Sequence, residues 1–317
     1  MADAFSLREN GGRVTSTGFI NAWAPQSEPP CAIGYPAFLL AILPFQHTLH
    51  PATMHDMNTT CSPQNIAALC RPAAQSIHIQ VVAETGSTNA DLLAQVDTLQ
   101  AATLLIAEKQ TAGRGRAGRV WLAAPGATLT FSLAWKFNRP TKEMVGLPLA
   151  VGVALVHALD SFDVAAQLKW PNDLLRDGKK LGGTLIETAI DKQDGGMWAI
   201  IGIGLNLTMP AELAAQIDHP VTDAPELAKL DRNAVMAALL SSLAETLTVF
   251  EEQGFKAFMK RWNALHAYAG QAVVIQDRDR VLYEGTAVGV DAGGSLQLDT
   301  ANGRVAVVAG DVSLRKG

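Results

Sequence analysis

The pattern of apolar and polar positions predicts alternating strands and helices from residue 77 to residue 266. Ile77–Val82 alternates as a half-buried strand does, whereas Ala102–Ala107 is a continuous apolar run that is typical of a buried strand. Four later segments are also predicted strands: Thr128–Trp135, Ala166–Trp170, Gly183–Thr188 and Trp198–Ile203. Strands mixed with helices in this way indicate an α+β domain.

Helices are predicted where apolar residues recur near a 3.6-residue period. The polar stretch Ser87–Asn89 supplies N-cap side chains for a helix over Ala90–Gln95. An amphipathic helix is predicted from Thr141, and His157 lies among its apolar residues, so we interpret His157 as a core side chain. Asp231 caps a further helix that carries regularly spaced leucines.

The chain divides into three predicted parts. Residues 1–74 are rich in Pro, Gly, Ser, Thr and Asn without a sustained period, so we interpret them as a poorly patterned extension. This extension is either disordered or precedes a native start at Met54 or Met57. Residues 75–266 form the larger mixed domain. Residues 267–317 alternate in short runs, and the hairpin signal Asn302–Gly303 predicts a small SH3-like β-barrel there.

Composition and charge exclude some classes of function. The formal net charge is −5 and the pI is about 5.8, which argues against a general nucleic-acid binder. No run approaches the eighteen or so apolar residues of a membrane span, so no membrane association is expected. The three cysteines all precede residue 71. This distribution argues against a disulfide framework and favours a cytoplasmic location.

A metal site is one possible reading of the first part of the chain. Three histidines and two cysteines lie there within a short stretch, but their spacing fits no standard zinc pattern. These residues are His47, His50, His55, Cys61 and Cys70. The sequence therefore predicts no dedicated metal site.

The segment Gly113–Arg119, named the arginine loop, interleaves three glycines with three arginines. Arginine forks match phosphate and carboxylate geometry, and the repulsion between the arginines should leave the loop disordered unless an anion holds it. Its glycines satisfy the dinucleotide pattern G-x-G-x-x-G, but that pattern must open a helix, and here Pro125 and a strand follow. We interpret the loop as a lid over a phosphorylated small molecule; the alternative is a solvated basic loop.

Four other segments place polar residues beside predicted strands or helices. Lys169–Asp173 follows an apolar strand and could hold phosphate, ribose or Mg²⁺, or form an Asx turn. Lys179–Gly183 places a lysine at a strand mouth, or is a hairpin with exposed lysines. Gly202–Leu207 permits close approach of a ligand, or is a glycine-rich bulge. Ser87 and Thr88 offer hydroxyls to a neutral polar ligand group, or serve only as helix caps.

Taken in order, these segments resemble one family, the biotin protein ligases, over about residues 77–317. The resemblance is carried by Glu84–Asn89, Gln110–Trp121, Lys169–Asp173, Lys180–Gly183 and Gly202–Asn206. It implies a class II synthetase-like catalytic domain, a mixed sheet flanked by helices, over residues 75–266. It also implies two half-reactions: biotin and MgATP give biotinyl-5′-AMP, and biotin then passes to one lysine of the biotin carboxyl carrier protein of acetyl-CoA carboxylase.

The resemblance also implies a role for each matched residue. Lys180 and Arg116 would act on the reacting carboxylate and phosphate. The biotin-binding residues would be Ser87, Thr88, Asn89, Gln110, Gly113, Arg114, Arg116, Lys180 and Gly183. The residues that bind ATP or the adenylate would be Arg116, Arg119, Trp121, Asn172, Asp173, Asn206 and Arg315. No protein side chains would form a separate metal site, because Mg²⁺ would arrive with ATP.

Two departures from the family pattern shape the prediction. Ala117 stands where many relatives carry another basic residue, although the three remaining arginines still suffice for phosphate. Residues 1–74 show no winged-helix pattern, so we expect a monofunctional ligase that binds no DNA and acts as a monomer or weak homodimer. The competing readings are a lipoate–protein ligase, a non-catalytic biotin sensor and, disfavoured by the missing helix, a Rossmann dehydrogenase.

Overall fold

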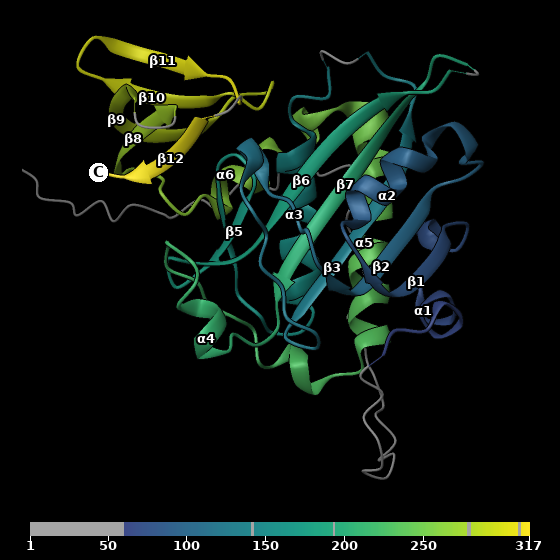
Figure 1. Cartoon of the computed structure of the whole chain (residues 1–317). Helices are drawn as coiled ribbons and strands as arrows, with labels where there is room; N and C mark the ends of the chain where they lie inside the picture. The colour runs from purple at the N-terminus through teal and green to yellow at the C-terminus, as the bar shows by residue number, and fades with distance from the viewer. Residues whose placement is uncertain (1–59, 141–142, 193, 278–279, 310–311) are drawn as a thin grey trace, which may run out of the picture. The chain divides into compact units, whose positions relative to one another are not determined.

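The computed structural model describes residues 60–140, 143–192, 194–277, 280–309 and 312–317. Its larger part is a seven-stranded mixed sheet with helices on both faces, and a five-stranded antiparallel sheet follows (Figure 1). The helices are α1 (Pro63–Leu69), α2 (Thr88–Gln95), α3 (Leu147–Asp160), α4 (Ala211–Ala214), α5 (Arg232–Gln253) and α6 (Met259–Leu265). The strands of the larger sheet are β1 (His78–Thr85), β2 (Thr103–Gln110), β3 (Thr128–Phe137), β4 (Gln167–Lys169), β5 (Asp173–Arg176), β6 (Lys179–Ile190) and β7 (Met197–Asn206).

The strand order of the larger sheet is β1-β2-β3-β7-β6-β5-β4. Strands β1 and β2 are parallel because helix α2 crosses over between them, and the other neighbours are antiparallel. β5 pairs with β4 on one side and, on the other, with the first residues of β6, from Lys179 to Gly183. The segments that carry the sequence motifs thereby meet around β6 and β7, although they lie far apart along the chain.

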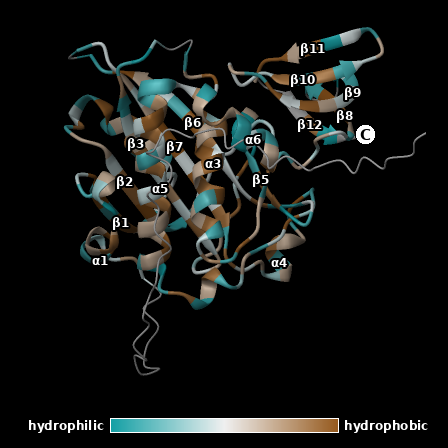
Figure 2. Ribbon diagram, turned by 180° about the vertical axis from the view of Figure 1, so that it is seen from behind, coloured by the Kyte–Doolittle hydropathy of each residue, from teal (hydrophilic) through white to brown (hydrophobic). Residues whose placement is uncertain are grey.

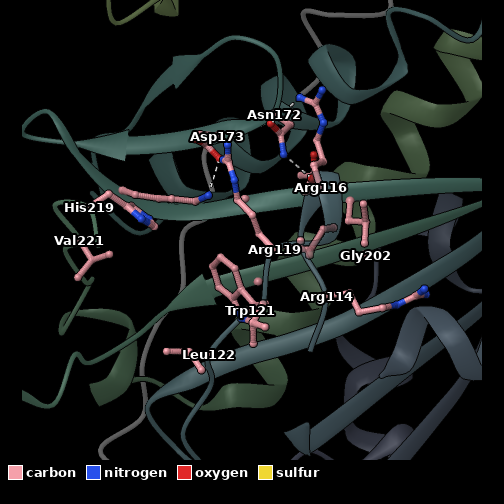
Figure 3. Close-up of a pocket in the computed structure, with 18 of the residues that line it drawn as sticks. Arg114, Arg116, Arg119, Trp121, Leu122, Asn172, Asp173, Gly202, His219 and Val221 are labelled. Carbon is pink, nitrogen blue, oxygen red and sulfur yellow. Dashed lines mark hydrogen bonds and ion pairs between the residues drawn. The ribbon is translucent and has the colours of Figure 1, made fainter. Parts of the chain in front are cut away.

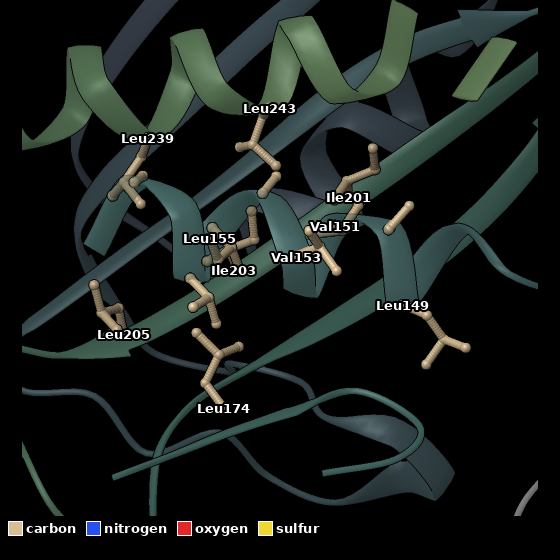
Figure 4. Packing of buried hydrophobic residues seen from close by; sticks show 14 of the residues in the cluster. Leu149, Val151, Val153, Leu155, Leu174, Ile201, Ile203, Leu205, Leu239 and Leu243 are labelled. Atoms are coloured by element: carbon tan, nitrogen blue, oxygen red, sulfur yellow. The ribbon is translucent and has the colours of Figure 1, made fainter. Parts of the chain in front are cut away.

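Two apolar cores form on the two faces of this sheet. The larger one joins α3 and α5 to one face of β3 and β7. Leu155 of α3, Ile201 of β7 and Leu243 of α5 belong to it (Figure 4). The smaller one places Leu92 of α2 against Trp198 and Ile200. Hydrophobic residues accordingly concentrate in the central strands (Figure 2). Helix α5 is long and apolar enough to cross a bilayer, but it is mostly buried here, as the core helix of a folded domain is.

Three expectations from the sequence are wrong. Residues 60–74 belong to the folded domain, because α1 packs on α5 with Ile66 fully buried; residues 1–59 lie outside the described part of the chain. The helix expected from Thr141 begins at Leu147, after the exposed Val145, and residues 141–142 are not described. His157 is exposed, because its position on α3 faces away from the core.

The C-terminal part is a five-stranded antiparallel sheet in the order β11-β10-β9-β8-β12. Its strands are β8 (Ala272–Asp277), β9 (Arg280–Val290), β10 (Leu296–Thr300), β11 (Gly303–Val307) and β12 (Val312–Lys316). The expected hairpin at Asn302–Gly303 joins β10 to β11. The indole of Trp170 donates to the carbonyl of Gly294 at 3.2 Å and so ties this sheet to the first. The predicted α+β class with a small C-terminal β domain is confirmed.

Candidate active site

A cavity of about 810 Å³ lies between the start of α2, the arginine loop and strands β5, β6 and β7 (Figure 3). Of the fifteen site residues predicted from the sequence, fourteen line it. They are Ser87, Thr88, Asn89, Gln110, Arg114, Arg116, Arg119, Trp121, Asn172, Asp173, Lys180, Gly183, Asn206 and Arg315. The fold therefore gathers the separate motifs around one space, which is large enough for a nucleotide-sized ligand.

Gly113 is the one predicted residue outside the cavity lining, and its role is to shape the arginine loop. The amide of Trp121 donates to the Gly113 carbonyl at 2.9 Å, and that of Gly115 donates to the Arg119 carbonyl at 2.7 Å. A Cβ at Gly113 would lie 2.5 Å from the carbonyl oxygen of Trp121, so only glycine fits. The loop is thus a closed hairpin, and Arg114 and Arg116 bind protein side chains, as described below.

A chain of hydrogen bonds forms the polar end of the cavity at the start of α2. The side-chain oxygen of Gln110 accepts from the Thr88 amide at 2.8 Å and from its hydroxyl at 3.1 Å. The Thr88 hydroxyl also lies 2.6 Å from that of Ser132 on β3. Ser87 is buried at the N-cap position, yet its side chain makes no capping hydrogen bond. Ser87 lines the cavity instead, so helix capping alone does not explain a serine at this position.

Asn89 is fully engaged with the protein. Its amide donates to the Leu185 carbonyl at 3.2 Å and to the Glu187 carboxylate at 2.8 Å, and its oxygen accepts from Ser132 at 2.6 Å. A Cβ at Gly202 would lie 2.3 Å from the Asn89 oxygen, so the side chain rests directly on β7. Asn89 lines the cavity, but its polar atoms support the floor and do not point freely at a ligand.

The cationic end of the cavity is organised around Asp173. Its carboxylate lies 2.7 Å from the Lys180 ammonium and 3.7 Å from that of Lys169. Burial alone would raise the pKa of Asp173, but the charges of Lys180 and Lys169 outweigh it and hold the pKa below its ordinary value. Burial lowers the pKa of Lys169, although Asp173 opposes that shift. The pair of lysines therefore presents positive charge to the cavity around a single ionised carboxylate.

Trp121 forms an aromatic wall beside Lys180. A Cβ at Gly204 of β7 would lie 2.3 Å from the indole ring, so the ring packs directly on the strand backbone. The Lys180 ammonium lies 5.7 Å from the ring centroid, within the range of a cation–π contact. Two glycine-dependent contacts, at Gly113 and Gly204, thus fix where this tryptophan stands.

Two asparagines connect the cavity wall to neighbouring segments. Asn172 accepts from the Arg116 guanidinium at 3.1 Å and donates to the Thr184 carbonyl at 2.6 Å, so it links the arginine loop to β6. Asn206, at the end of β7, donates to the Thr222 carbonyl at 3.0 Å. Arg315 reaches the cavity from β12 of the C-terminal sheet. The lining is therefore built from both parts of the fold.

Several lining residues were not singled out from the sequence. Lys169 belongs to the segment Lys169–Asp173 that the sequence singled out, but it was given no role of its own; it ends β4. Ser132 lies inside β3, where periodicity alone gives no reason to select it. His219, which is labelled in Figure 3, lines the cavity after the short helix α4. The carboxylate of Asp218 lies 2.9 Å from its imidazole. Glu187 is not part of the cavity lining, but it contacts the lining residues Arg114 and Asn89. It occupies a polar position of β6, and the alternation of that strand is the signal that could have selected it. Among the described residues, no three His, Cys, Asp or Glu side chains gather as metal ligands.

Comparisons with known proteins agree with this geometry. Residues 80–206 match the Biotin/lipoate A/B protein ligase family, and residues 268–315 match the biotin protein ligase C terminal domain. The chain is 34% identical over 249 residues to the biotin–[acetyl-CoA-carboxylase] ligase of Mycobacterium tuberculosis, covering 74% of this chain and 88% of that one. It is 30% identical over 239 residues to the bifunctional ligase/repressor BirA of Escherichia coli, covering 75% and 74%.

Solved structures show the same fold. The biotin protein ligase from Aquifex aeolicus in complex with biotin and ATP is 29% identical, with a TM-score of 0.63 over 76% of this chain and 99% of that one. Fold, cavity and relatives together define a ligase. The chain belongs to the biotin protein ligase family.

Proposed function

We propose that this chain activates biotin with MgATP and transfers it to one lysine of the biotin carboxyl carrier protein of acetyl-CoA carboxylase. The observation that carries the proposal is the single cavity, where the polar end at Thr88, the arginine loop and Lys180 meet. The similarity to a biotin–[acetyl-CoA-carboxylase] ligase and to a structure that binds biotin and ATP supports it.

The first half-reaction is assigned to the cationic end of the cavity. A biotin carboxylate oxygen attacks the α-phosphorus of ATP, the bond to the bridging oxygen breaks, and pyrophosphate leaves. Lys180 stabilises the charge that develops on the carboxylate and the α-phosphate, because its ammonium is held there by Asp173. Arg116 and Arg119 bind phosphate oxygens, and Mg²⁺ enters with the nucleotide.

The second half-reaction uses the acyl-adenylate that the cavity holds. The carrier lysine amine attacks the biotinyl carbonyl carbon, the acyl–oxygen bond breaks, AMP leaves, and the amine loses a proton. An acyl-adenylate hydrolyses in water, so it must be sheltered between the two steps. The arginine loop supplies that shelter, because its residues line one side of the cavity.

The polar end favours biotin over lipoate. A ureido group offers two N–H donors and a carbonyl acceptor, which hydroxyls and amides at Ser87, Thr88 and Gln110 complement. Lipoate carries no such group at its ring. We further propose that the ligase is monofunctional, since residues 1–74 show no winged-helix pattern, and that it is cytoplasmic, since the positions of the three cysteines favour no disulfide framework.

Incubation of the purified chain with biotin, MgATP and a carrier domain tests the proposal by intact-mass spectrometry. We expect one biotinyl group on one carrier lysine and none when ATP is left out. Lipoate in place of biotin should give no product. Transfer of lipoyl groups would show that the chain is a lipoate–protein ligase. Adenylate formation without any transfer would indicate a biotin sensor instead.

A further inference from the structure

Glu187 joins the arginine loop to the floor of the cavity through one oxygen atom. Its Oε2 accepts from the Arg114 guanidinium at 2.8 Å and from the Asn89 amide, also at 2.8 Å. Arg114 comes from the first turn of the arginine loop, whereas Asn89 belongs to helix α2. A single carboxylate on β6 therefore fixes the distance between two elements that have no other such link through a charged side chain in the described chain.

The floor side of this link is rigid. Asn89 is buried, lies on the backbone of Gly202 and accepts from Ser132. The Ser132 hydroxyl in turn contacts that of Thr88, whose amide donates a hydrogen bond to Gln110. Glu187 is thus anchored to the hydrogen-bond chain that forms the proposed biotin end of the cavity. If any side chain in this hydrogen-bond chain shifts, the Glu187 carboxylate that binds Arg114 shifts with it.

The loop side of this link needs a negative charge. Arg114, Arg116 and Arg119 lie within six residues, and their mutual repulsion opposes a closed hairpin. The Glu187 carboxylate offsets one of these charges at the base of the hairpin. The ion pair is partly exposed, with 41% and 27% of the two side chains accessible, so it adds little to global stability. Its effect is local and concerns where the loop stands.

We propose that Glu187 is a positioning residue, which holds Arg114 and thereby the arginine loop in register with the polar floor at Asn89 and Thr88. It touches no reacting atom itself. The inference rests on the proposed function only for its kinetic consequence: a loop released from the floor closes less often over bound biotin. Its structural consequence, a fixed loop, holds for the chain without any ligand.

The structural consequence is tested with Glu187→Gln, which keeps the shape of the side chain and removes its charge. Trypsin cleaves after arginine, so cleavage at Arg114 in the ligand-free protein reports release of the loop. We expect cleavage to be faster by about fivefold, which corresponds to the loss of about 1 kcal/mol of local interaction. Glu84→Gln, which breaks an exposed ion pair with Lys109, is the matched control and should cleave like the parent protein.

The kinetic consequence is tested by biotin-dependent exchange of pyrophosphate into ATP. Glu187→Gln should raise the KM for biotin about fivefold and change kcat less than twofold, a split that a general loss of folding does not produce. In the background of Arg114→Met, the same substitution should have no further effect, because its partner is gone.

The outcomes separate the two proposals. Unchanged cleavage at Arg114, a lower KM for biotin, or additive effects of the two substitutions would overturn the role of Glu187. Absence of exchange in the parent protein would overturn the proposed function instead, and the cleavage result would still decide whether Glu187 fixes the loop.

Discussion

At the scale of single residues, the Lys180 ammonium is the group placed to act on the reacting atoms. It is held by Asp173 at 2.7 Å and lies above the Trp121 ring. Removal of one such donor from a preorganised site typically costs about 100- to 1,000-fold in kcat. We therefore expect Lys180→Ala to reduce adenylate formation by about that factor, measured as biotin-dependent pyrophosphate release. Near-normal release would remove Lys180 from the mechanism.

Gly204 is a residue whose importance lies in the side chain that it lacks. A Cβ there would lie 2.3 Å from the Trp121 ring, so Gly204→Ala must displace the indole into the cavity. Overpacking of this kind costs about 1–3 kcal/mol. We expect a higher KM for ATP in the exchange assay, with the melting temperature measured in parallel. An unchanged KM together with an unchanged melting temperature would show that the tryptophan does not border the nucleotide.

The residues that sequence predicted and those that it missed differ in a physical way. Ser87, Lys180 and the arginine loop stand out because polar or charged residues mark a helix start, a strand mouth and a glycine-rich loop, positions that local sequence identifies. Ser132 and Glu187 sit at ordinary strand positions, and only the pairing of β3, β7 and β6 brings them beside Asn89. The local sequence pattern does not determine which residues of distant strands lie opposite each other. The contacts of Ser132 and Glu187 could therefore be found only from the folded structure.

At the scale of elements, the arginine loop is expected to retain the acyl-adenylate. Arg116 lines the cavity and is held by Asn172, so Arg116→Gly removes a charge and a tether from the middle of the loop. We expect free biotinyl-5′-AMP in solution and biotin on lysines of a bystander protein, both read by mass spectrometry. Arg304→Gly, at an exposed ion pair with Asp299 in the C-terminal sheet, is the matched control and should leave no such labels. Full retention of adenylate by Arg116→Gly would contradict the sheltering role.

Element prediction succeeded where periodicity is strong and failed where packing decides. All six predicted strands of the larger domain exist, because apolar runs in β2, β3 and β7 are long and buried. The strand β5 was missed, since its four residues give no usable period. Helix α1 was missed because a seven-residue helix is stabilised by docking on α5, through Ile66 and the Arg71–Glu245 ion pair, and not by its own pattern.

At the scale of the whole molecule, His266 lies where the larger domain passes into the C-terminal sheet. It is buried, its ring lies 4.8 Å from that of Trp262, and neither ring nitrogen has a hydrogen-bond partner among the described residues. Burial lowers the pKa of His266 from 6.5 to about 4, because the charged imidazole would lose its hydration. The folded chain therefore takes up this proton only at a lower pH than the unfolded chain does.

This difference makes the stability of the whole fold depend on pH in a definite direction. Above pH 6.5 the ring is neutral in both states, so it adds no pH dependence there. Between pH 6.5 and about 4 the unfolded state binds a proton that the folded state does not. The free energy of unfolding should fall over this window by about 3 kcal/mol from His266 alone. Urea unfolding at pH 7.5 and at pH 4 measures the loss, which His266→Phe should reduce. His157→Phe, at an exposed position of α3, should keep the parent pH dependence; if both variants keep it, the buried ring is not its source.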